Sequence, residues 1–202
     1  MDYDKMFDYV FKVLNENNAL YSKRFPFRNR FEHIKRVFNW CIKIKDDIKC
    51  DEEVLLTAAI FHDVGYCYGK DNHANASAKL FIDYATKCEF EYEFIMKTAD
   101  IISLHSNKEL LQNSNIYDEL ILLLEADLLD EEGALGICWD VMQAALEPQA
   151  NYTKCLQALD QHSAHILNQD FMVTPLAKKY WQEKQEIFTT FRDSLKADLF
   201  IE

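Results

Sequence analysis

Glycine and proline are scarce in this chain, which has four glycines and three prolines among its 202 residues. Average proteins contain about 7% glycine and about 5% proline, and a β-rich fold of this length would need many of them for its turns. Hydrophobic residues make up 49% of the chain and aromatic residues 13%, which is enough for a buried core and too much for a disordered chain. The composition therefore predicts an all-α fold.

Positive charge is also in short supply, with 22 Lys and Arg against 34 Asp and Glu and a net charge of -12. Binding to nucleic-acid polymers depends on neutralising their phosphates, so we expect no such partner. One segment is the exception, because its six basic residues surround a single acid, Glu32: Lys23, Arg24, Arg28, Arg30, Lys35 and Arg36. This segment is either an ordinary solvated helix face or an anion-attracting rim for a phosphorylated substrate.

The six cysteines include no C-x-x-C pair, and several occupy positions typical of buried apolar residues. They indicate reduced thiols rather than a disulfide framework or a zinc knuckle. The opening segment MDYDKMFDYV is acidic and amphipathic, unlike a signal peptide. No apolar run reaches the roughly 18 residues that a membrane span requires. We therefore expect a cytoplasmic protein with no membrane partner.

Apolar residues recur at helical spacing along nearly the whole chain. Asp51 is a plausible N-cap for a helix that runs through VLLTAAIF and stops at Gly65, and Thr174 with Pro175 marks the start of the last helix. The other helices are expected at about 3–18, 29–49, 73–88, 91–105, 115–130, 133–146 and 152–169, with the last at about 175–197. Without a linker or repeat, the pattern predicts one domain over 1–202, with a core at about 29–146 and C-terminal helices over 152–197.

Ligand-type side chains interrupt three of these apolar faces. Asp127 shares its face with leucines, His33 lies beside Ile34, and His62 follows a small, apolar stretch. A buried carboxylate without a partner is unfavourable by several kcal/mol, so Asp127 needs a metal ion or a Lys or Arg from a neighbouring helix. Asp63 directly follows His62, and the small residues around this pair, including Gly65, permit close approach of neighbouring helices.

Two imidazoles and two carboxylates form a ligand set suited to a divalent cation. If His33, His62, Asp63 and Asp127 meet in space, they would hold an ion that makes hydroxide from water near neutral pH, as metal-dependent hydrolases do. A His-Asp pair alone is weak evidence, and a single histidine on an apolar face is more often a satisfied core residue than a ligand. The joint pattern on three helices favours the metal site.

Five motifs follow one another in a recognisable order: EHIKRV (32–37), LLTAAIFHDVG (55–65), HANASA (73–78), ISLHS (102–106) and ADLLDEEGALG (126–136). The closing stretch MVTPLAKKYWQEKQEIFTTF adds a sixth similarity. Over about 29–192 the chain resembles the HD-domain metal-dependent phosphohydrolase superfamily, in particular a branch of small, single-domain bacterial proteins that are similar to nucleotide pyrophosphohydrolases. The resemblance implies an all-helical HD fold.

For the metal centre, the resemblance implies that His33, His62, Asp63 and Asp127 hold one divalent ion. Mn²⁺ is the expected ion for such a set, with Fe, Ni, Co, Mg and Zn as alternatives. Asp130, one turn after Asp127, would orient a ligand histidine, although a simple solvated aspartate is nearly as plausible.

For catalysis, the resemblance implies hydrolysis of a phosphate ester or anhydride of a small molecule, with nucleotides as the substrate class. His73 and His105 would lie at the mouth of the site, to bind phosphate, relay protons or hold a second metal; in the plainer alternatives, His73 is a solvent-exposed residue and His105 a helix C-terminal imidazole. The candidates for proton transfer are Asp63, Asp71 and His105. The candidates for binding substrate phosphates are His73, Arg28, Arg30, Lys35 and Lys70. Whether the protein forms a homodimer is a question that the sequence leaves open.

One position departs from the branch, which usually has arginine where this chain has Leu128. Without that guanidinium, an ion pair that positions the carboxylates of the site could be weaker, or the protein could contact a different phosphate of the substrate. Two rival functions also stay open. A di-iron HD oxygenase would use His73 and His105 as additional ligands, and a degenerate HD module would bind a nucleotide for regulation without turnover.

Overall fold

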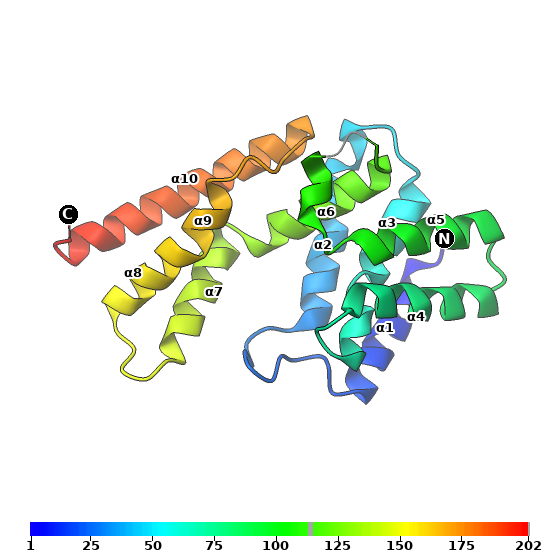
Figure 1. The fold of residues 1–202 in the computed structure, drawn as a ribbon, viewed down its shortest axis with the longest axis horizontal. Helices are drawn as coiled ribbons and strands as arrows, with labels where there is room; N and C mark the ends of the chain where they lie inside the picture. The colour runs from blue at the N-terminus through cyan, green and yellow to red at the C-terminus, as the bar shows by residue number, and fades with distance from the viewer. Residues whose placement is uncertain (113–114, 202) are drawn as a thin grey trace. The chain divides into compact units, whose positions relative to one another are not determined.

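The computed structural model describes residues 1–112 and 115–201, and the chain divides into two compact units, Met1–Asp127 and Leu128–Glu202 (Figure 1). Over these residues the regular structure is α-helix and short 3₁₀ helix, with one isolated bridge between Tyr21 and Asn29. The predicted all-α class is confirmed. No helix of the described part is both long and apolar enough to cross a bilayer. That the chain forms one domain stays a prediction.

Among the described residues, the first unit contains the α-helices α1 to α5, most of α6 and three short 3₁₀ segments. In chain order they are α1 (Tyr3–Glu16), α2 (Arg30–Ile44), η1 (Lys45–Asp47), α3 (Glu52–Phe61), η2 (Val64–Tyr68), α4 (His73–Lys87), α5 (Tyr92–Leu104), η3 (Lys108–Gln112) and α6 (Asp118–Glu131). The second unit holds the end of α6 together with α7 (Ala134–Ala145), α8 (Tyr152–Gln161), α9 (Ser163–Leu167) and α10 (Pro175–Asp198).

Helix α3 is the centre of the first unit. Its N-cap is Asp51, as predicted, whose carboxylate accepts hydrogen bonds from the backbone N–H groups of Glu53 and Val54. From Val54 to Phe61 every side chain of α3 is buried, and the helix contacts α1, α2, α4 and α5. A helix that is apolar on all sides is stable only when it is surrounded by others. The residues at its C-terminal end are therefore delivered into the interior.

Gly65 brings η2 against the start of α4. Its N–H donates a 2.8 Å hydrogen bond to the Ser77 hydroxyl, and a Cβ at this position would collide with the backbone of His73 and Ser77. The predicted close approach at Gly65 is thus confirmed, although α3 itself ends earlier, at Phe61. This contact sets the segment that carries Asp63 beside the helix that begins with His73.

The prediction of a single helix over 152–169 is wrong, because the helix is interrupted at His162 and forms two helices, α8 and α9. His162 has φ -108° and ψ -84°, outside the helical region. Asp140 of α7 explains the break: its carboxylate accepts the Ser163 backbone N–H at 3.3 Å and lies 3.1 Å from His162 Nδ1. A buried carboxylate that captures a backbone N–H takes that donor out of the helical ladder. The predicted start of α10 at Pro175 is confirmed.

Candidate metal centre

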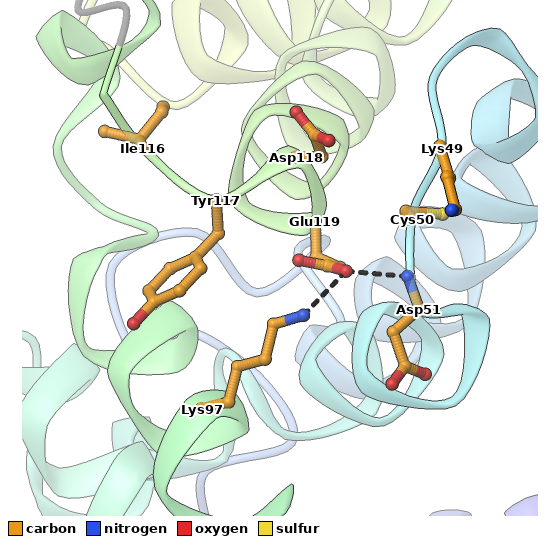
Figure 2. A pocket seen from close by; sticks show the side chains of 8 residues that line it. All are labelled: Lys49, Cys50, Asp51, Lys97, Ile116, Tyr117, Asp118 and Glu119. Atoms are coloured by element: carbon orange, nitrogen blue, oxygen red, sulfur yellow. Dashed lines mark hydrogen bonds and ion pairs between the residues drawn. The ribbon is translucent and has the colours of Figure 1, made fainter.

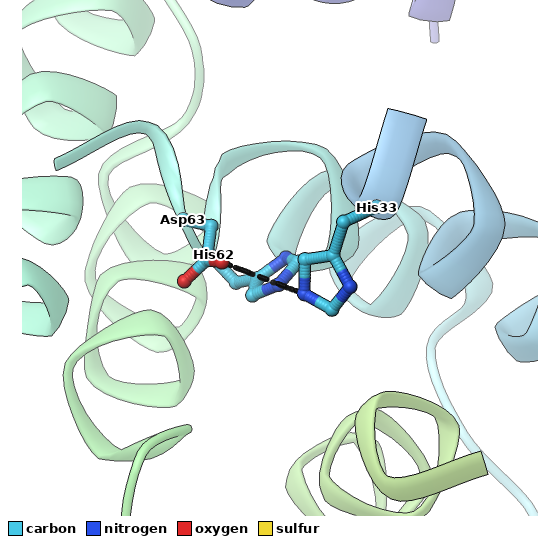
Figure 3. Close-up of side chains that lie close together, drawn as sticks. All are labelled: His33, His62 and Asp63. Carbon is cyan, nitrogen blue, oxygen red and sulfur yellow. Dashed lines mark hydrogen bonds and ion pairs between the residues drawn. The ribbon is translucent and has the colours of Figure 1, made fainter. Parts of the chain in front are cut away.

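The predicted ligand residues come from three places in the first unit. His33 is on α2, His62 and Asp63 follow the last residue of α3, and Asp127 is on α6. All four are buried, with exposed fractions of 8% or less. Figure 3 shows His33, His62 and Asp63 directed toward one another. The structure therefore brings together residues that are up to 94 positions apart in the chain.

The polar atoms of this cluster lie close together. His33 Nε2 is 3.3 Å from His62 Nε2, 3.4 Å from Asp63 Oδ2 and 3.2 Å from Asp127 Oδ1. His62 Nε2 is 3.7 Å from Asp63 Oδ2. One ligand atom each from His33, His62 and Asp63 lies within 4.8 Å of the others. Ligands on opposite sides of one ion, with bonds of about 2.0–2.3 Å, are separated by up to about 4.6 Å. The spacing accommodates one cation.

Backbone carbonyls orient the histidines. His62 Nδ1 lies 2.8 Å from the carbonyl of Ala59, and His105 Nδ1 lies 2.7 Å from that of Ile102. In each case the carbonyl is three residues earlier, so the turn of helix preceding the histidine fixes its ring. A neutral imidazole that donates from Nδ1 keeps a lone pair on Nε2. Nε2 of His62 is thereby presented to His33 and Asp63, and Nε2 of His105 is presented to Asp63 from the other side of the carboxylate.

Burial and neighbouring charges favour the ligand protonation states. Burial lowers the pKa of His62 to about 4, which leaves its imidazole neutral at pH 7. For Asp63, burial alone would raise the pKa, but Arg30 and the surrounding histidines outweigh it and hold the pKa well below the usual value. Burial likewise opposes ionisation of Asp127, and Lys108 followed by His33 lowers its pKa well below the usual range. The site thus offers a neutral imidazole with two carboxylates.

Asp127 also provides a test of whether a cation fits. Its Oδ1 is buried and lies 3.2 Å from His33 Nε2, yet this oxygen accepts no hydrogen bond from the described part of the chain. A buried carboxylate oxygen without a partner is unfavourable unless a proton or a cation lies beside it. The donor set of imidazole nitrogen and carboxylate oxygen suits a divalent ion. The residues therefore fit the predicted metal.

A second cluster uses the other oxygen of Asp63. Asp63 Oδ1 is 3.3 Å from both His73 Nε2 and His105 Nε2, and these two nitrogens are 3.3 Å apart. These three side chains also satisfy the spacing of a metal-binding group. His105 is buried and His73 is half-buried at the first turn of α4. Asp63 is thus shared, with Oδ2 in the first cluster and Oδ1 in the second.

Arg30 reaches this shared carboxylate from the first turn of α2. It is buried, forms an ion pair with Asp63 Oδ2, and its guanidinium carbon lies 3.7 Å from the centre of the Tyr66 ring. The Tyr66 ring in turn lies 4.2 Å from the imidazole of His73. Tyr66 therefore contacts both Arg30 and His73, which each contact a different oxygen of Asp63. That Arg30 binds substrate phosphate stays a prediction.

The other predicted substrate and proton-transfer residues are more peripheral. Lys35 pairs with Glu32 on the same helix at 2.7 Å, and Arg28 is half-buried in the loop before α2. Lys70 and Asp71 are exposed in the turn before α4. The Lys70 backbone contributes directly, because its carbonyl lies 3.0 Å from Nδ1 of His73 and orients that ring. The roles of their side chains stay predictions.

Two residues of the site were missed in the sequence, Tyr66 and Lys108. The Lys108 ammonium pairs with Asp127 Oδ2. Sequence reasoning required a metal ion or a basic residue beside Asp127, but nothing marked this lysine except its position three residues after His105. Lys108 and Arg30 together place positive charge beside the carboxylates of the site. The chain has Leu128 at the position where the similar branch usually has arginine. Asp130 is buried, and its orienting role stays a prediction.

A hollow of about 580 Å³ lies away from this centre, where the starts of α3 and α6 meet α5 (Figure 2). Glu119 joins these elements: its carboxylate accepts the Asp51 backbone N–H at 2.6 Å and pairs with Lys97 at 2.9 Å. None of the residues that line the hollow belongs to the histidine and aspartate clusters. Its contacts hold three helices of the first unit together.

The family model of the HD domain matches residues 30–164, and the chain belongs to this family. Among solved structures it is similar to YpgQ of Bacillus subtilis, with 20% identity, coverage of 96% of this chain and 94% of that chain, and a TM-score of 0.71. A second YpgQ structure, in complex with ADP, has 19% identity, coverage of 96% and 93%, and a TM-score of 0.69.

An HD-superfamily hydrolase of Bacillus thuringiensis is similar as well, with 19% identity, coverage of 98% of this chain and 97% of that chain, and a TM-score of 0.73. Comparison with curated proteins gave no match. At these identities the solved structures establish the fold, which is the all-helical HD fold that the motifs predicted. Members with this fold include hydrolases, and the chain has a histidine and aspartate cluster that can bind a metal.

Proposed function

We propose that this protein is a metal-dependent phosphohydrolase that acts on a small phosphorylated molecule, with nucleotides as the substrate class. The observation that carries the proposal is the cluster of ligand atoms around His33: His62 and Asp63 form with it a group with the spacing of a metal-binding site, and Asp127 Oδ1 lies 3.2 Å from His33 Nε2. The ADP complex of YpgQ supports a phosphorylated ligand, since that protein shares the fold. We expect Mn²⁺ as the ion, as the resemblance of the motifs implies, with Fe, Ni, Co, Mg and Zn as alternatives.

In this mechanism the two imidazoles of His33 and His62 and the two carboxylates of Asp63 and Asp127 would hold the ion. When bound, a divalent ion supplies a water of lowered pKa and positive charge beside a phosphoryl oxygen. Arg30 fixes the orientation of Asp63 through their ion pair, so that Oδ1 stays directed at His105 and His73. His105, with Nε2 3.3 Å from that oxygen, is placed beside Asp63 as a candidate for proton transfer to or from the substrate.

Metal analysis followed by activity measurements tests the proposal. The purified protein should bind one equivalent of Mn²⁺ and hydrolyse at least one member of a panel of nucleoside di- and triphosphates and phosphomonoesters. Asp127→Ala should abolish both. Stoichiometric nucleotide binding without turnover under excess Mn²⁺ would instead indicate a regulatory HD module, and wild-type metal content in Asp127→Ala would refute the ligand assignment.

A di-iron oxygenase is the second candidate, and one observation favours it. Asp63 lies between two histidine pairs with one oxygen directed to each, an arrangement in which a carboxylate can serve two ions. Two irons per chain and a visible absorption band would support this candidate. Colourless protein with a single Mn²⁺ and phosphatase activity would exclude it.

A further inference from the structure

Lys108 lies at the edge of the metal centre and occupies the side of Asp127 that faces away from His33. It is the first residue of η3, and its ammonium pairs with Asp127 Oδ2, whereas Oδ1 faces His33. The Lys108 side chain is 21% exposed and that of Asp127 is 11% exposed. Both side chains are thus largely buried, and the lysine is the more exposed of the two.

The two cations of the site differ in how firmly they are held. Arg30 is 9% exposed and its guanidinium stacks on Tyr66, which itself contacts His73. Lys108 is more exposed and carries its charge on a flexible four-carbon stem. Lysine can leave its carboxylate by rotating that stem, whereas the guanidinium is fixed by stacking as well as by charge.

Two carboxylates of the site are each paired with one basic side chain. Asp63 and Asp127 carry two negative charges, and Arg30 and Lys108 carry two positive ones. A divalent ion bound by Asp127 would add two positive charges and repel the nearby ammonium. The ion and Lys108 therefore compete for one carboxylate, and the loaded site carries an excess of positive charge that an anion would neutralise.

We propose that Lys108 competes with the metal for Asp127 and, once displaced, binds the phosphate of the substrate. This inference rests on the proposed function, because it requires the ion to bind at Asp127. The displaced ammonium remains within the length of its side chain from the centre, and a phosphate beside the metal is its natural partner. Metal and phosphate binding should then be coupled, each strengthening the other by the same factor.

The experiment measures Mn²⁺ affinity by calorimetry, with and without saturating inorganic phosphate. In the wild type, phosphate should tighten Mn²⁺ binding by about tenfold, within the usual range of coupling between sites. Lys108→Gln should bind Mn²⁺ about tenfold or more tightly without phosphate, and the coupling to phosphate should disappear. Lys108→Arg retains a cation and should retain the coupling.

Lys97→Gln is the matched control. Lys97 is a partly exposed lysine that pairs with a buried acid, Glu119, in the hollow away from the centre (Figure 2). Its replacement removes the same charge from the same unit and should leave Mn²⁺ affinity and its coupling to phosphate unchanged. An equal effect in both glutamine variants would show a general charge effect and overturn the role of Lys108.

The outcomes separate this inference from the proposed function. Wild-type Mn²⁺ affinity in Lys108→Gln would overturn the competition, and coupling that persists in this variant would overturn the transfer to phosphate. Absence of coupling in the wild type overturns the inference even if the glutamine variant does not fold. Mn²⁺ binding without turnover would refute the proposed function alone, whereas a wild type that binds no Mn²⁺ would refute both.

Discussion

Replacing Glu132 by glutamine should stabilise the second unit, by an amount that grows as the pH rises. Glu132 is 4% exposed, and its Oε2 accepts no hydrogen bond from the described residues. Burial raises its pKa from 4.5 to about 8, with further increases from Glu131 and Asp140, while Ser163 and Lys184 act in the opposite direction. The folded protein therefore keeps a proton on Glu132 at pH values where the unfolded chain releases it.

The sign and size of the effect follow from linkage. The contribution of Glu132 to the unfolding free energy is complete below pH 4.5. It is lost as the pH rises toward the folded-state pKa of about 8, and above that pH the unfolding free energy no longer changes on account of this group. Each pKa unit corresponds to about 1.4 kcal/mol, so the complete loss is on the order of 5 kcal/mol, with about 3 kcal/mol of it between pH 6 and 9. Glutamine cannot ionise, so Glu132→Gln should not show this decline.

Urea unfolding at pH 6 to 9, followed by tryptophan fluorescence, measures the effect, because Trp139 and Trp181 both belong to the second unit. The difference between Glu132→Gln and the wild type should widen steadily across this range. Glu183→Gln, an exposed residue of α10 with the same charge change, is the control and should follow the wild type. Parallel stability curves for Glu132→Gln and the wild type would refute the reasoning.

The remaining predictions concern the metal centre and the packing around it. Asp127→Ala should lose the metal while its circular dichroism stays helical, whereas Leu124→Ala should lose about 2–5 kcal/mol of unfolding free energy and keep the metal, because it removes core volume. Gly65→Ala should lower the unfolding free energy by about 1–3 kcal/mol or more, since its Cβ would collide with the start of α4. His105→Ala should lower turnover with one metal retained, or halve the metal content if two ions bind; unchanged turnover and metal content would contradict both.

Features that depend on neighbours along the chain could be read from the sequence. The scarcity of glycine and proline and the helical spacing of apolar residues predicted the all-α class. The N-cap Asp51 and Pro175 at the first helical position predicted two helix starts. The motif order predicted the HD fold. Burial of a carboxylate on a leucine-rich face also required a partner for Asp127, because such a group is unstable alone.

Features that depend on how helices pack were decided by the tertiary structure. The break at His162 arises because Asp140, 22 residues earlier, takes the Ser163 backbone N–H from the helix. Asp127 is paired with Lys108 across the packing of α6 against the segment after α5, and no pattern in the sequence singles out that lysine. The basic segment 23–36 was expected to be either a solvated helix face or an anion-attracting rim, yet Arg30 turns inward to Asp63. Helical periodicity specifies which face a residue occupies, whereas the side chain it meets is specified only when two helices come together.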